Sequence, residues 1–327
     1  MADDLDAILA DLSIVEYDED IFEMSYYKLR KHFGFVSGGL HTSRLIRNLI
    51  WQDHGKLGRG ELQPLHGNVR SYWYARIKPV LARGKAKKYA KKYDMMINQF
   101  VTLVVHHRLM DYAEFGFTDE GAHNRKIGSG NRHIFCIAEK TGHMPLLQEL
   151  ADDYDITIVA LGGQPSALSS EYLLRELEQA GFTRTEPVPM LTIVDYDPHG
   201  ALIADSFVYQ CGKLGFSAEL DRIDLAHPSR MSHDQIRLNR YPLSRRKSER
   251  KKNHKWAAKT GGLSEYGYSA LYGLEADAMS WSQLTDAFDE QVGPHLAIPR
   301  EQIVRRRFKK ELVELMKELL LVRLGVA

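Results

Sequence analysis

Between Arg132 and Ile223 the chain alternates short apolar segments with longer stretches of helical periodicity. The apolar segments predict strands and the stretches between them predict helices, joined by short turns that contain Gly or Pro. This alternation is typical of a parallel sheet covered by helices, so we predict an α/β fold with a mainly parallel sheet. The predicted strands are 134–138, 156–161, 191–194 and 217–223, and the predicted helices are 145–151, 167–180 and 201–214.

Two aspartates follow the third predicted strand, in the sequence LTIVDYDPHG at Leu191–Gly200. Because strand side chains alternate between faces, Asp195 and Asp197 should point the same way. Mg²⁺ takes one or two carboxylates from a protein and leaves its other positions to water and phosphate oxygens. Asp-x-Asp ahead of Gly is also ordinary turn chemistry, so the pair alone leaves both interpretations open.

A glutamate stands at the tip of an earlier predicted strand, in IFCIAEKTG at Ile134–Gly142. A strand ending in Glu139, a further strand and helix, and then a strand ending in Asp-x-Asp resemble the metal site of Toprim domains. The resemblance implies that Glu139, Asp195 and Asp197 gather one or two Mg²⁺ ions. Such ions stabilise the charge that develops on a scissile phosphate and its leaving oxygen.

Length and composition suit a globular protein of two domains, since the chain has 327 residues and 44% of them are hydrophobic. The first residues do not read as a signal peptide, and no apolar run is long enough to span a bilayer, so we expect a cytoplasmic protein without a membrane partner. Cys136 and Cys211 are the two cysteines, and we expect both to be buried reduced thiols.

The charges are unevenly distributed, although the formal net charge is only +1. Acidic residues crowd the first twenty positions, and basic clusters follow at 85–92, 245–255 and 305–310. Each cluster could neutralise several phosphates and release counterions, although a charge run is more often a solvated face. The candidate DNA-binding residues are Arg245, Arg246, Lys247, Lys251 and Lys252.

The pattern predicts three parts of the chain. Residues 1–20 form an acidic leader, and residues 21–130 form a helical domain in which a short extended segment near 108–117 is compatible with a winged helix. Residues 131–327 form the α/β domain, which ends in an amphipathic helix over about 300–324. We expect that helix to be a packing or dimer element, because one side carries Val304, Phe308, Leu312, Leu315, Met316, Leu319 and Leu320.

The segment VRSYWY at Val69–Tyr74 holds the candidate nucleophile. Arg70 and Tyr74 are four residues apart and therefore share one face of a helix, where the guanidinium can lie beside the phenol or bind the phosphate that it attacks. Tyr has an ordinary pKa near 10 and needs a neighbouring cation to act as a nucleophile. Tyr72 is an alternative nucleophile. Taken alone, the segment favours the other interpretation, in which Tyr72, Trp73 and Tyr74 are core aromatics that anchor the helix.

As a set, these residues resemble the A subunit of type IIB topoisomerases (DNA topoisomerase VI) and its relative, the meiotic double-strand-break transesterase, from about residue 60 to about residue 280. Arg70 and Tyr74 match the family's Arg-x-x-x-Tyr motif. AEKTG at Ala138–Gly142 matches its Glu strand, and DYDPHG at Asp195–Gly200 is close to its Asp-x-Asp-Pro-His/Tyr-Gly. Weaker similarities are LGGQPS at Leu161–Ser166 and GLEADAM at Gly273–Met279.

The resemblance implies a winged-helix domain that bears the nucleophile, a Toprim domain, and Mg²⁺-dependent cleavage of double-stranded DNA by a nucleoid-associated homodimer. Tyr74 would form a 5′-phosphotyrosyl link, Arg70 would steady the phosphate, and the tyrosine of one protomer would work with the metal of the other. Two departures matter. Trp73 stands where the family usually has a second tyrosine, and the region ahead of Arg70, through which the family's A subunit meets its GHKL-type ATPase B subunit, matches poorly.

Three functions therefore remain open. The chain is a transesterase, with or without an ATPase partner, or a Toprim nuclease that hydrolyses DNA with metal-activated water, or a DNA-binding subunit with vestigial carboxylates. The complete set of Glu139, Asp195 and Asp197 argues against the last of these. Since the sequence has no P-loop, any ATP dependence would come from another chain.

Overall fold

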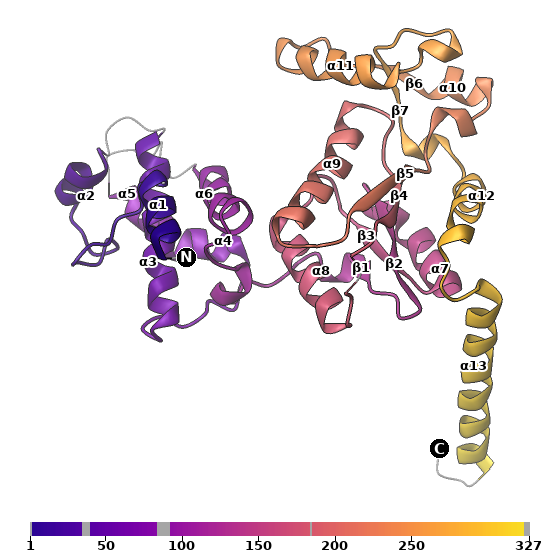
Figure 1. The fold of residues 1–327 in the computed structure, drawn as a ribbon, viewed down its shortest axis with the longest axis horizontal. Coiled ribbons are helices and arrows are strands. Elements are labelled where there is room, and N and C mark those ends of the chain that lie inside the picture. The colour runs from indigo at the N-terminus through magenta and orange to yellow at the C-terminus, as the bar shows by residue number, and fades with distance from the viewer. Residues whose placement is uncertain (1, 35–39, 84–91, 184, 324–327) are drawn as a thin grey trace. The chain divides into compact units, whose positions relative to one another are not determined.

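The computed structural model describes residues 2–34, 40–83, 92–183 and 185–323, which form two compact units (Figure 1). Unit 1 comprises Met1–Glu120 together with Ala167–Tyr172. Unit 2 comprises Gly121–Ser166 and Leu173–Ala327. Each unit has its own core and is described separately.

Unit 1 is helical and is built around a long central helix, α3. The side chains of Leu45, Ile46, Leu49 and Ile50 on α3 are fully buried. A cluster of rings lies beside them, in which Phe100 contacts Phe115 and Phe117 at centroid distances of 5.3 and 5.4 Å. The helices are α1 (Ala2–Asp11), α2 (Tyr26–Phe33), α3 (Leu40–Gly58), α4 (Val69–Tyr72), α5 (Lys78–Ala82) and α6 (Tyr93–Val101), with π-helical turns at Trp73–Ile77 and Thr102–His106.

The prediction of an extended segment near residues 108–117 was wrong. Tyr112–Phe115 is a 3₁₀ helix, and a single bridge between Gly67 and Phe117 is the only β-type pairing among the described residues of unit 1. Side chains cause the difference, because a capping box of Asp111 and Glu114 starts the turn. Glu171 then accepts hydrogen bonds from the backbone N–H groups of Tyr112 and Ala113, at 2.9 and 3.1 Å.

Unit 2 contains a five-stranded sheet in the order β1-β3-β2-β4-β5. The two-residue strand β1 runs antiparallel to β3, and the other neighbours are parallel. This confirms the predicted α/β class and the mainly parallel sheet. The strands are β1 (Arg125–Lys126), β2 (Asn131–Ala138), β3 (Ile156–Ala160), β4 (Val188–Ile193) and β5 (Leu220–Asp224).

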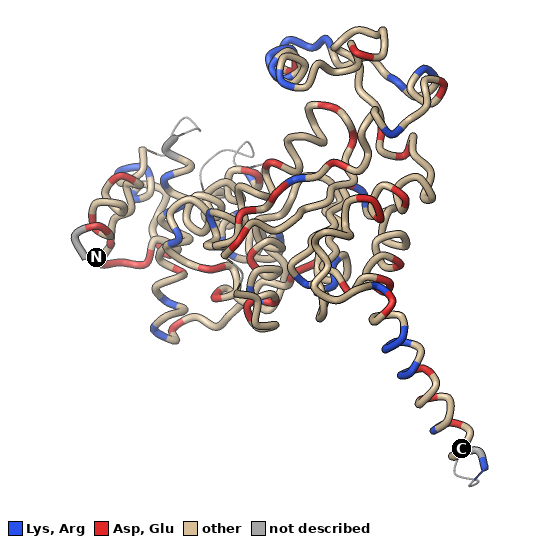
Figure 2. The backbone as a smooth tube through the Cα atoms, turned by 45° about the vertical axis from the view of Figure 1, so that its right-hand side comes forward, with Lys and Arg blue, Asp and Glu red and all other residues tan. Residues whose placement is uncertain are grey.

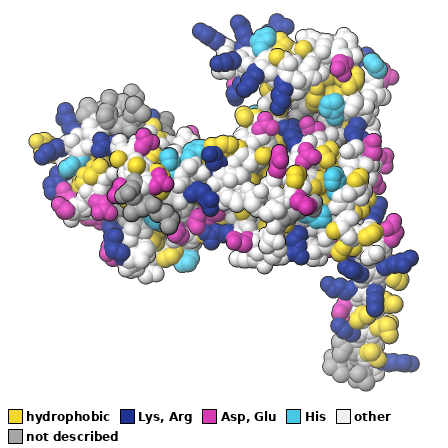
Figure 3. Space-filling view, viewed as in Figure 1, with side chains coloured by type: hydrophobic (Ala, Val, Ile, Leu, Met, Phe, Trp, Pro, Cys, Tyr) yellow, Lys and Arg dark blue, Asp and Glu magenta, His cyan; other side chains and the backbone are white. Residues whose placement is uncertain are grey.

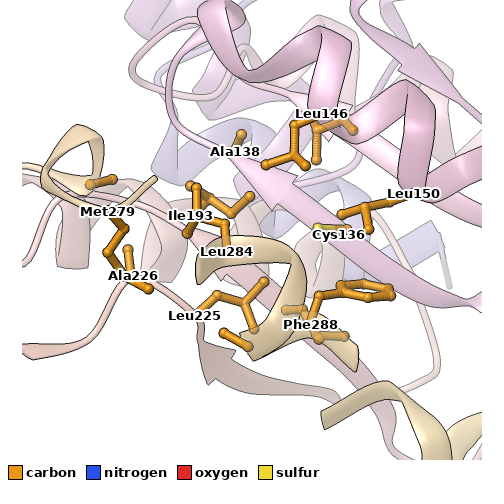
Figure 4. Packing of buried hydrophobic residues seen from close by; sticks show 14 of the residues in the cluster. Cys136, Ala138, Leu146, Leu150, Ile193, Leu225, Ala226, Met279, Leu284 and Phe288 are labelled. Atoms are coloured by element: carbon orange, nitrogen blue, oxygen red, sulfur yellow. The ribbon is translucent and has the colours of Figure 1, made fainter. Parts of the chain in front are cut away.

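Alternate residues of β2 serve two separate cores, one on each face of the sheet. Ile134, Cys136 and Ala138 pack with α7 (Met144–Tyr154) and α12 (Trp281–Val292), as the cluster in Figure 4 shows. Phe135 and Ile137 pack with side chains of α8 (Ala167–Gln179) and α9 (Pro198–Lys213). Because both faces are covered, the strands read as almost continuous apolar runs. Cys136 and Cys211 are buried and unbonded to each other, which confirms the expected free thiols.

Residues 230–260 are more regular than expected. They contain α10 (His233–Asn239), β6 (Arg240–Pro242) and α11 (Lys247–Thr260), and β6 pairs antiparallel with β7 (Tyr272–Leu274). The predicted C-terminal helix is confirmed as α13 (Arg300–Arg323). Within the described ranges, every helix is too short or too polar to cross a bilayer.

Candidate functional site

The candidate metal site lies where the direction of strand addition reverses. From β2 the chain adds β3 on one side and then returns to add β4 on the other side of β2. Ala138 and Ile193 are paired at the ends of β2 and β4, so the residues that follow both strands leave the sheet together. The crevice outside the carboxyl ends of strands at such a switch point is the usual ligand site of open α/β sheets.

Glu139 follows β2 and contacts the segment that follows β4. Its Oε2 accepts a hydrogen bond from the backbone N–H of Asp195 at 3.2 Å, and its side chain is only slightly exposed. Burial raises the pKa of Glu139, and the negative charges of Asp195 and Asp197 add to the rise. Glu139 is therefore close enough to Asp195 and Asp197 for their negative charges to repel, and a bound cation would relieve that repulsion.

Asp195 is held from both sides of the crevice. Its Oδ1 accepts a hydrogen bond from the backbone N–H of Ala276 at 2.8 Å and lies 3.1 Å from Nζ of Lys140. Lys140 also pairs with Asp277 at 2.9 Å and with Glu275 at 3.5 Å. Burial alone would lower the pKa of Lys140, but the hydrogen bonds and charges of Asp277 and Asp195 outweigh it and raise the pKa.

Lys140, Glu275 and Asp277 were not predicted as site residues. Lys140 follows Glu139 directly in the sequence, and the two acidic residues belong to the GLEADAM segment at Gly273–Met279. That segment was singled out only as a similarity, because nothing in the sequence indicates that β7 brings it beside Asp195. The isolated bridge between Tyr196 and Leu274 makes this connection.

Asp197 has a structural role as well as a possible ligand role. Its Oδ1 caps α9 by accepting hydrogen bonds from the backbone N–H groups of His199 and Gly200, each at 2.7 Å, and Pro198 occupies the first turn. Its Oδ2 accepts a hydrogen bond from the Tyr241 hydroxyl at 2.8 Å. The turn-chemistry interpretation is therefore correct for Asp197, while Asp195 precedes the turn.

The chemistry of these side chains fits Mg²⁺ at Glu139 and Asp195. Oε1 of Glu139 and Oδ2 of Asp195 accept no hydrogen bond from the described residues, and one or two carboxylates are what Mg²⁺ takes from a protein. In the described part of the chain, no three His, Cys, Asp or Glu side chains are already arranged to hold a metal. Both oxygens of Asp197 are engaged, so Asp197 would join such a site by giving up or sharing the Tyr241 hydrogen bond.

Gly200 allows the turn to close against Asp195, and we predict that Gly200→Ala destabilises unit 2. A Cβ at this position would lie 2.2 Å from the backbone oxygen of Asp195, which cannot move aside without shifting β4. We expect a loss of about 3 kcal/mol in the free energy of unfolding, measured by urea titration. Gly212→Ala is the matched control on α9, where the added methyl group meets nothing within 4 Å. It should be neutral or stabilise by about 0.5–1 kcal/mol, and equal effects of the two changes would contradict this account.

A cavity of about 630 Å³ opens beside Asp195 and Asp197. Its opposite wall is α11, which contributes Lys252, Lys255 and Lys259. Figure 2 shows the concentration of Lys and Arg on α11. The cavity thus joins carboxylates, which can hold a cation, to ammonium groups, which can hold phosphate oxygens. Trp256, Tyr196, Pro198 and Leu202 complete an apolar part of the wall.

The predicted DNA-binding residues lie on the exposed side of α11 and just ahead of its first residue. Arg245 and Arg246 precede α11, and Lys247, Lys251 and Lys252 are exposed on it. Of these, Lys252 lines the cavity. Lys255 and Lys259 were not predicted as site residues. Lys255 follows Lys252 by three residues and Lys259 follows Lys255 by four, so the spacing alone places the three lysines on one face of a helix. In the other basic clusters, residues 85–91 lie outside the described residues and 305–310 belong to α13.

Tyr74 is the accessible phenol of the VRSYWY segment in unit 1. Half of its surface is exposed, and it lies in the π-helical turn Trp73–Ile77. The guanidinium carbon of Arg70 is 5.9 Å from the centroid of the Tyr74 ring, and Nζ of Lys78 is 4.5 Å from it. A hydrogen bond from Arg70 lowers the pKa of Tyr74, and the charges of Arg70 and Lys78 lower it further. Both effects favour the phenolate, which is the attacking form.

Tyr72 occupies the opposite kind of environment. It is buried, and its hydroxyl donates a hydrogen bond of 2.9 Å to Oδ2 of Asp53, which also binds Arg76. Burial raises the pKa of Tyr72 well above its ordinary value, and the charge of Asp53 raises it further. Trp73 is also buried. The core-aromatic interpretation therefore describes Tyr72 and Trp73, and the geometry favours Tyr74 over Tyr72 as a nucleophile.

The predicted site residues fall into two groups. Glu139, Asp195 and Asp197 come together in unit 2, and Arg70 and Tyr74 come together in unit 1. No protein-family model matches the chain, and a search of curated proteins finds no significant match.

Proposed function

We propose that this protein is a Mg²⁺-dependent, DNA-cleaving transesterase that acts on double-stranded DNA as a homodimer, in the manner of the A subunit of type IIB topoisomerases. In this proposal unit 1 is the winged-helix domain that bears the nucleophile and unit 2 is the Toprim domain. The observation that carries it is the convergence of Glu139, Asp195 and Asp197 at the switch point of a mainly parallel sheet. The arginine-flanked, exposed Tyr74 supports the choice of transesterification.

The carboxylates of unit 2 would hold the metal and its lysines would hold the DNA backbone. Mg²⁺, when bound, stabilises negative charge on a phosphate and on its leaving oxygen. Glu139 and Asp195 would bind it, with Asp197 joining them. Lys252, Lys255 and Lys259 line the cavity beside Asp195 and Asp197 and would contact phosphates next to the one that reacts.

Tyr74 would supply the attacking oxygen. Its Oη forms a bond to phosphorus while the bond from phosphorus to the 3′ oxygen breaks, which leaves a 5′-phosphotyrosyl link and a free 3′-hydroxyl. The phenolic proton leaves Tyr74 and a proton is gained by the 3′ oxygen, so the exchange is balanced. One phosphodiester replaces another, and the break can be resealed. Arg70 both favours the phenolate and can bind the phosphate.

The partner and location of such an enzyme follow from the same proposal. A homodimer would let the tyrosine of one protomer work with the metal of the other, and a nucleoid-associated position in the cytoplasm would suit a DNA-cleaving enzyme. A GHKL-type ATPase is the candidate second subunit. To test for this subunit, the tagged chain is purified from its own cells and the eluate is assayed for ATP hydrolysis. The activity should be present only when a second protein co-purifies.

Hydrolysis of DNA by a Toprim nuclease is the alternative function. The observation that favours it is that Glu139, Asp195 and Asp197 all belong to unit 2, so the metal chemistry there needs no residue of unit 1. In that case a water molecule attacks the phosphate, and Tyr74 has no chemical role. The deciding experiment is to trap the reaction on end-labelled DNA with denaturant and ask whether label remains on the protein.

DNA binding should depend on the basic residues ahead of and within α11. Reversing the charges of Arg245, Arg246 and Lys247 together should reduce the slope of log K against log salt by up to about 2.7, since each lost phosphate contact removes about 0.9. Fluorescence anisotropy with a labelled duplex at several salt concentrations measures the slope. Reversing Lys126, Lys213 and Arg237, which are also exposed in unit 2, is the control and should change the slope much less. Equal changes would mean that α11 is an ordinary solvated face.

A further inference from the structure

The apolar side of α13 has no partner within the described chain. Every side chain that the structure describes from Val304 to Leu320 is exposed, and the large apolar ones include Phe308 at 66% and Leu319 at 61%. Figure 3 shows hydrophobic side chains along this helix, interspersed with basic ones. An apolar surface of this extent is uncommon on a monomer and usually marks an interaction site.

The start of α13 is anchored, so the helix is a fixed element of unit 2. Arg300 pairs with Asp153 of α7 and lies 4.8 Å from the ring centroid of Tyr154, and Ile303 is buried. Arg307 also reaches Asp153, at 3.3 Å. Beyond this point the helix gains no stability from packing, although packing of an apolar face is the main source of stability for most helices in water.

The apolar residues have the spacing of a two-stranded coiled coil. Phe308, Leu312, Leu315 and Leu319 follow one another at steps of four, three and four residues, which is the 3.5-residue period that lets two helices wrap around each other. Val304 and Met316 flank this seam, and Leu320 lies off it on the same face as Val313. A seam of this kind is complementary to another helix rather than to a flat surface.

The charges on α13 are divided along its length. Residues 305–310 carry five positive charges (Arg305, Arg306, Arg307, Lys309 and Lys310), and residues 311–318 carry three negative charges and one positive charge (Glu311, Glu314, Glu318 and Lys317). In a parallel pair of such helices, the two basic halves would face each other and repel. In an antiparallel pair, the basic half of each helix would face the acidic half of the other.

We propose that α13 pairs with α13 of a second copy of this chain, antiparallel, through the seam of Phe308, Leu312, Leu315 and Leu319. The charge division favours this occupant over an anionic membrane surface, because the glutamates in the second half of the helix would be repelled by the lipid headgroups. The proposal specifies the surface that holds the homodimer together. It rests on the helix itself and does not depend on the cleavage chemistry.

Sedimentation equilibrium of the full chain tests the pairing. The wild-type protein should have twice the chain mass of 37.4 kDa, and Leu315→Asp should raise the dissociation constant by about 100-fold or more, because it places a charge in the seam. Since Leu315 is exposed, the variant should keep the cores of both units, and its loss of helical circular dichroism should be confined to α13. Val313→Asp is the matched control, because Val313 is also exposed and apolar but lies off the seam. It should leave the dimer intact.

Disulfide trapping tests the orientation. The native cysteines are buried, so new thiols on α13 can be followed separately. An antiparallel pair through this seam brings Phe308 of one copy to Leu319 of the other. It predicts that Phe308→Cys protein mixed with Leu319→Cys protein yields a mixed disulfide, and that Leu319→Cys alone yields little. Efficient disulfide formation by Leu319→Cys alone would indicate a parallel pair and overturn the charge argument.

Three other outcomes would overturn the proposal. They are a monomeric wild-type protein, a dimer that Leu315→Asp leaves unchanged, and a wild-type monomer that instead binds vesicles of anionic lipid in a manner abolished by Phe308→Asp. A dimer that Leu315→Asp leaves unchanged would overturn this surface and leave the proposed chemistry standing, whereas a monomeric wild-type protein would count against the homodimer of the proposed function as well. Covalent attachment of DNA through Tyr74 is measured separately, so failure of the dimer surface and failure of the proposed chemistry can be told apart.

Discussion

Tyr74→Phe should abolish covalent attachment of DNA and lower Mg²⁺-dependent cleavage by about 10³-fold or more, because it removes only the attacking oxygen. Tyr74 is half exposed, so the loss of its hydroxyl should leave the stability of unit 1 nearly unchanged. The measurement uses duplex DNA labelled on the 3′ side of the break, which is the segment whose 5′ phosphate stays on the tyrosine, trapped with denaturant during the reaction. Label that migrates with the wild-type protein and not with the variant is the expected result.

Tyr72→Phe is the matched control two residues away. It removes the hydrogen bond to buried Asp53, so it should lower the free energy of unfolding by about 1–3 kcal/mol while covalent attachment persists at temperatures where the protein is folded. If Tyr72→Phe loses the adduct and Tyr74→Phe keeps it, the nucleophile is Tyr72. If both variants cleave DNA and neither wild type nor variants form an adduct, hydrolysis by the Toprim nuclease mechanism is the better account.

Asp195→Asn should lower Mg²⁺-dependent cleavage by about 10²- to 10⁴-fold, since loss of a metal ligand removes several kcal/mol of charge stabilisation. Asn keeps an oxygen that can accept the hydrogen bond from the Ala276 backbone, so the fold should survive the change. Removing a negative charge beside the cavity should also raise the affinity for DNA in the absence of metal. Plasmid cleavage at increasing Mg²⁺ concentration and anisotropy without metal measure the two effects.

Asp234→Asn provides the control for this substitution. Asp234 lies in α10 of the same unit and is strongly exposed, where it pairs only with Arg237 three residues away among the described side chains. It should cleave DNA as well as the wild type does. Undiminished cleavage by Asp195→Asn and by Glu139→Gln would show that these carboxylates do not hold the metal, and the proposed active site would then be wrong.

The sequence by itself determined the elements of unit 2 and the ends of the strands that carry the carboxylates. Periodicity identifies a buried parallel strand well, because both faces are covered and the apolar run is continuous, as at Ile134–Ala138 and Ile156–Leu161. The helix cap at Asp197 follows from Asp-Pro at the start of α9, but β4 ends at Ile193, so alternation along the strand does not reach Asp195 and Asp197. These are local properties of neighbouring residues.

Only the tertiary structure decided which distant residues meet. The order β3-β2-β4 places Glu139 beside Asp195, and β7 brings Glu275 and Asp277 to Lys140 across more than a hundred residues of chain. Likewise the sequence VRSYWY could not separate the two tyrosines, because burial depends on what packs against each ring. Asp53 of α3 holds Tyr72 in the core, and Tyr74 stays at the surface beside Arg70 and Lys78.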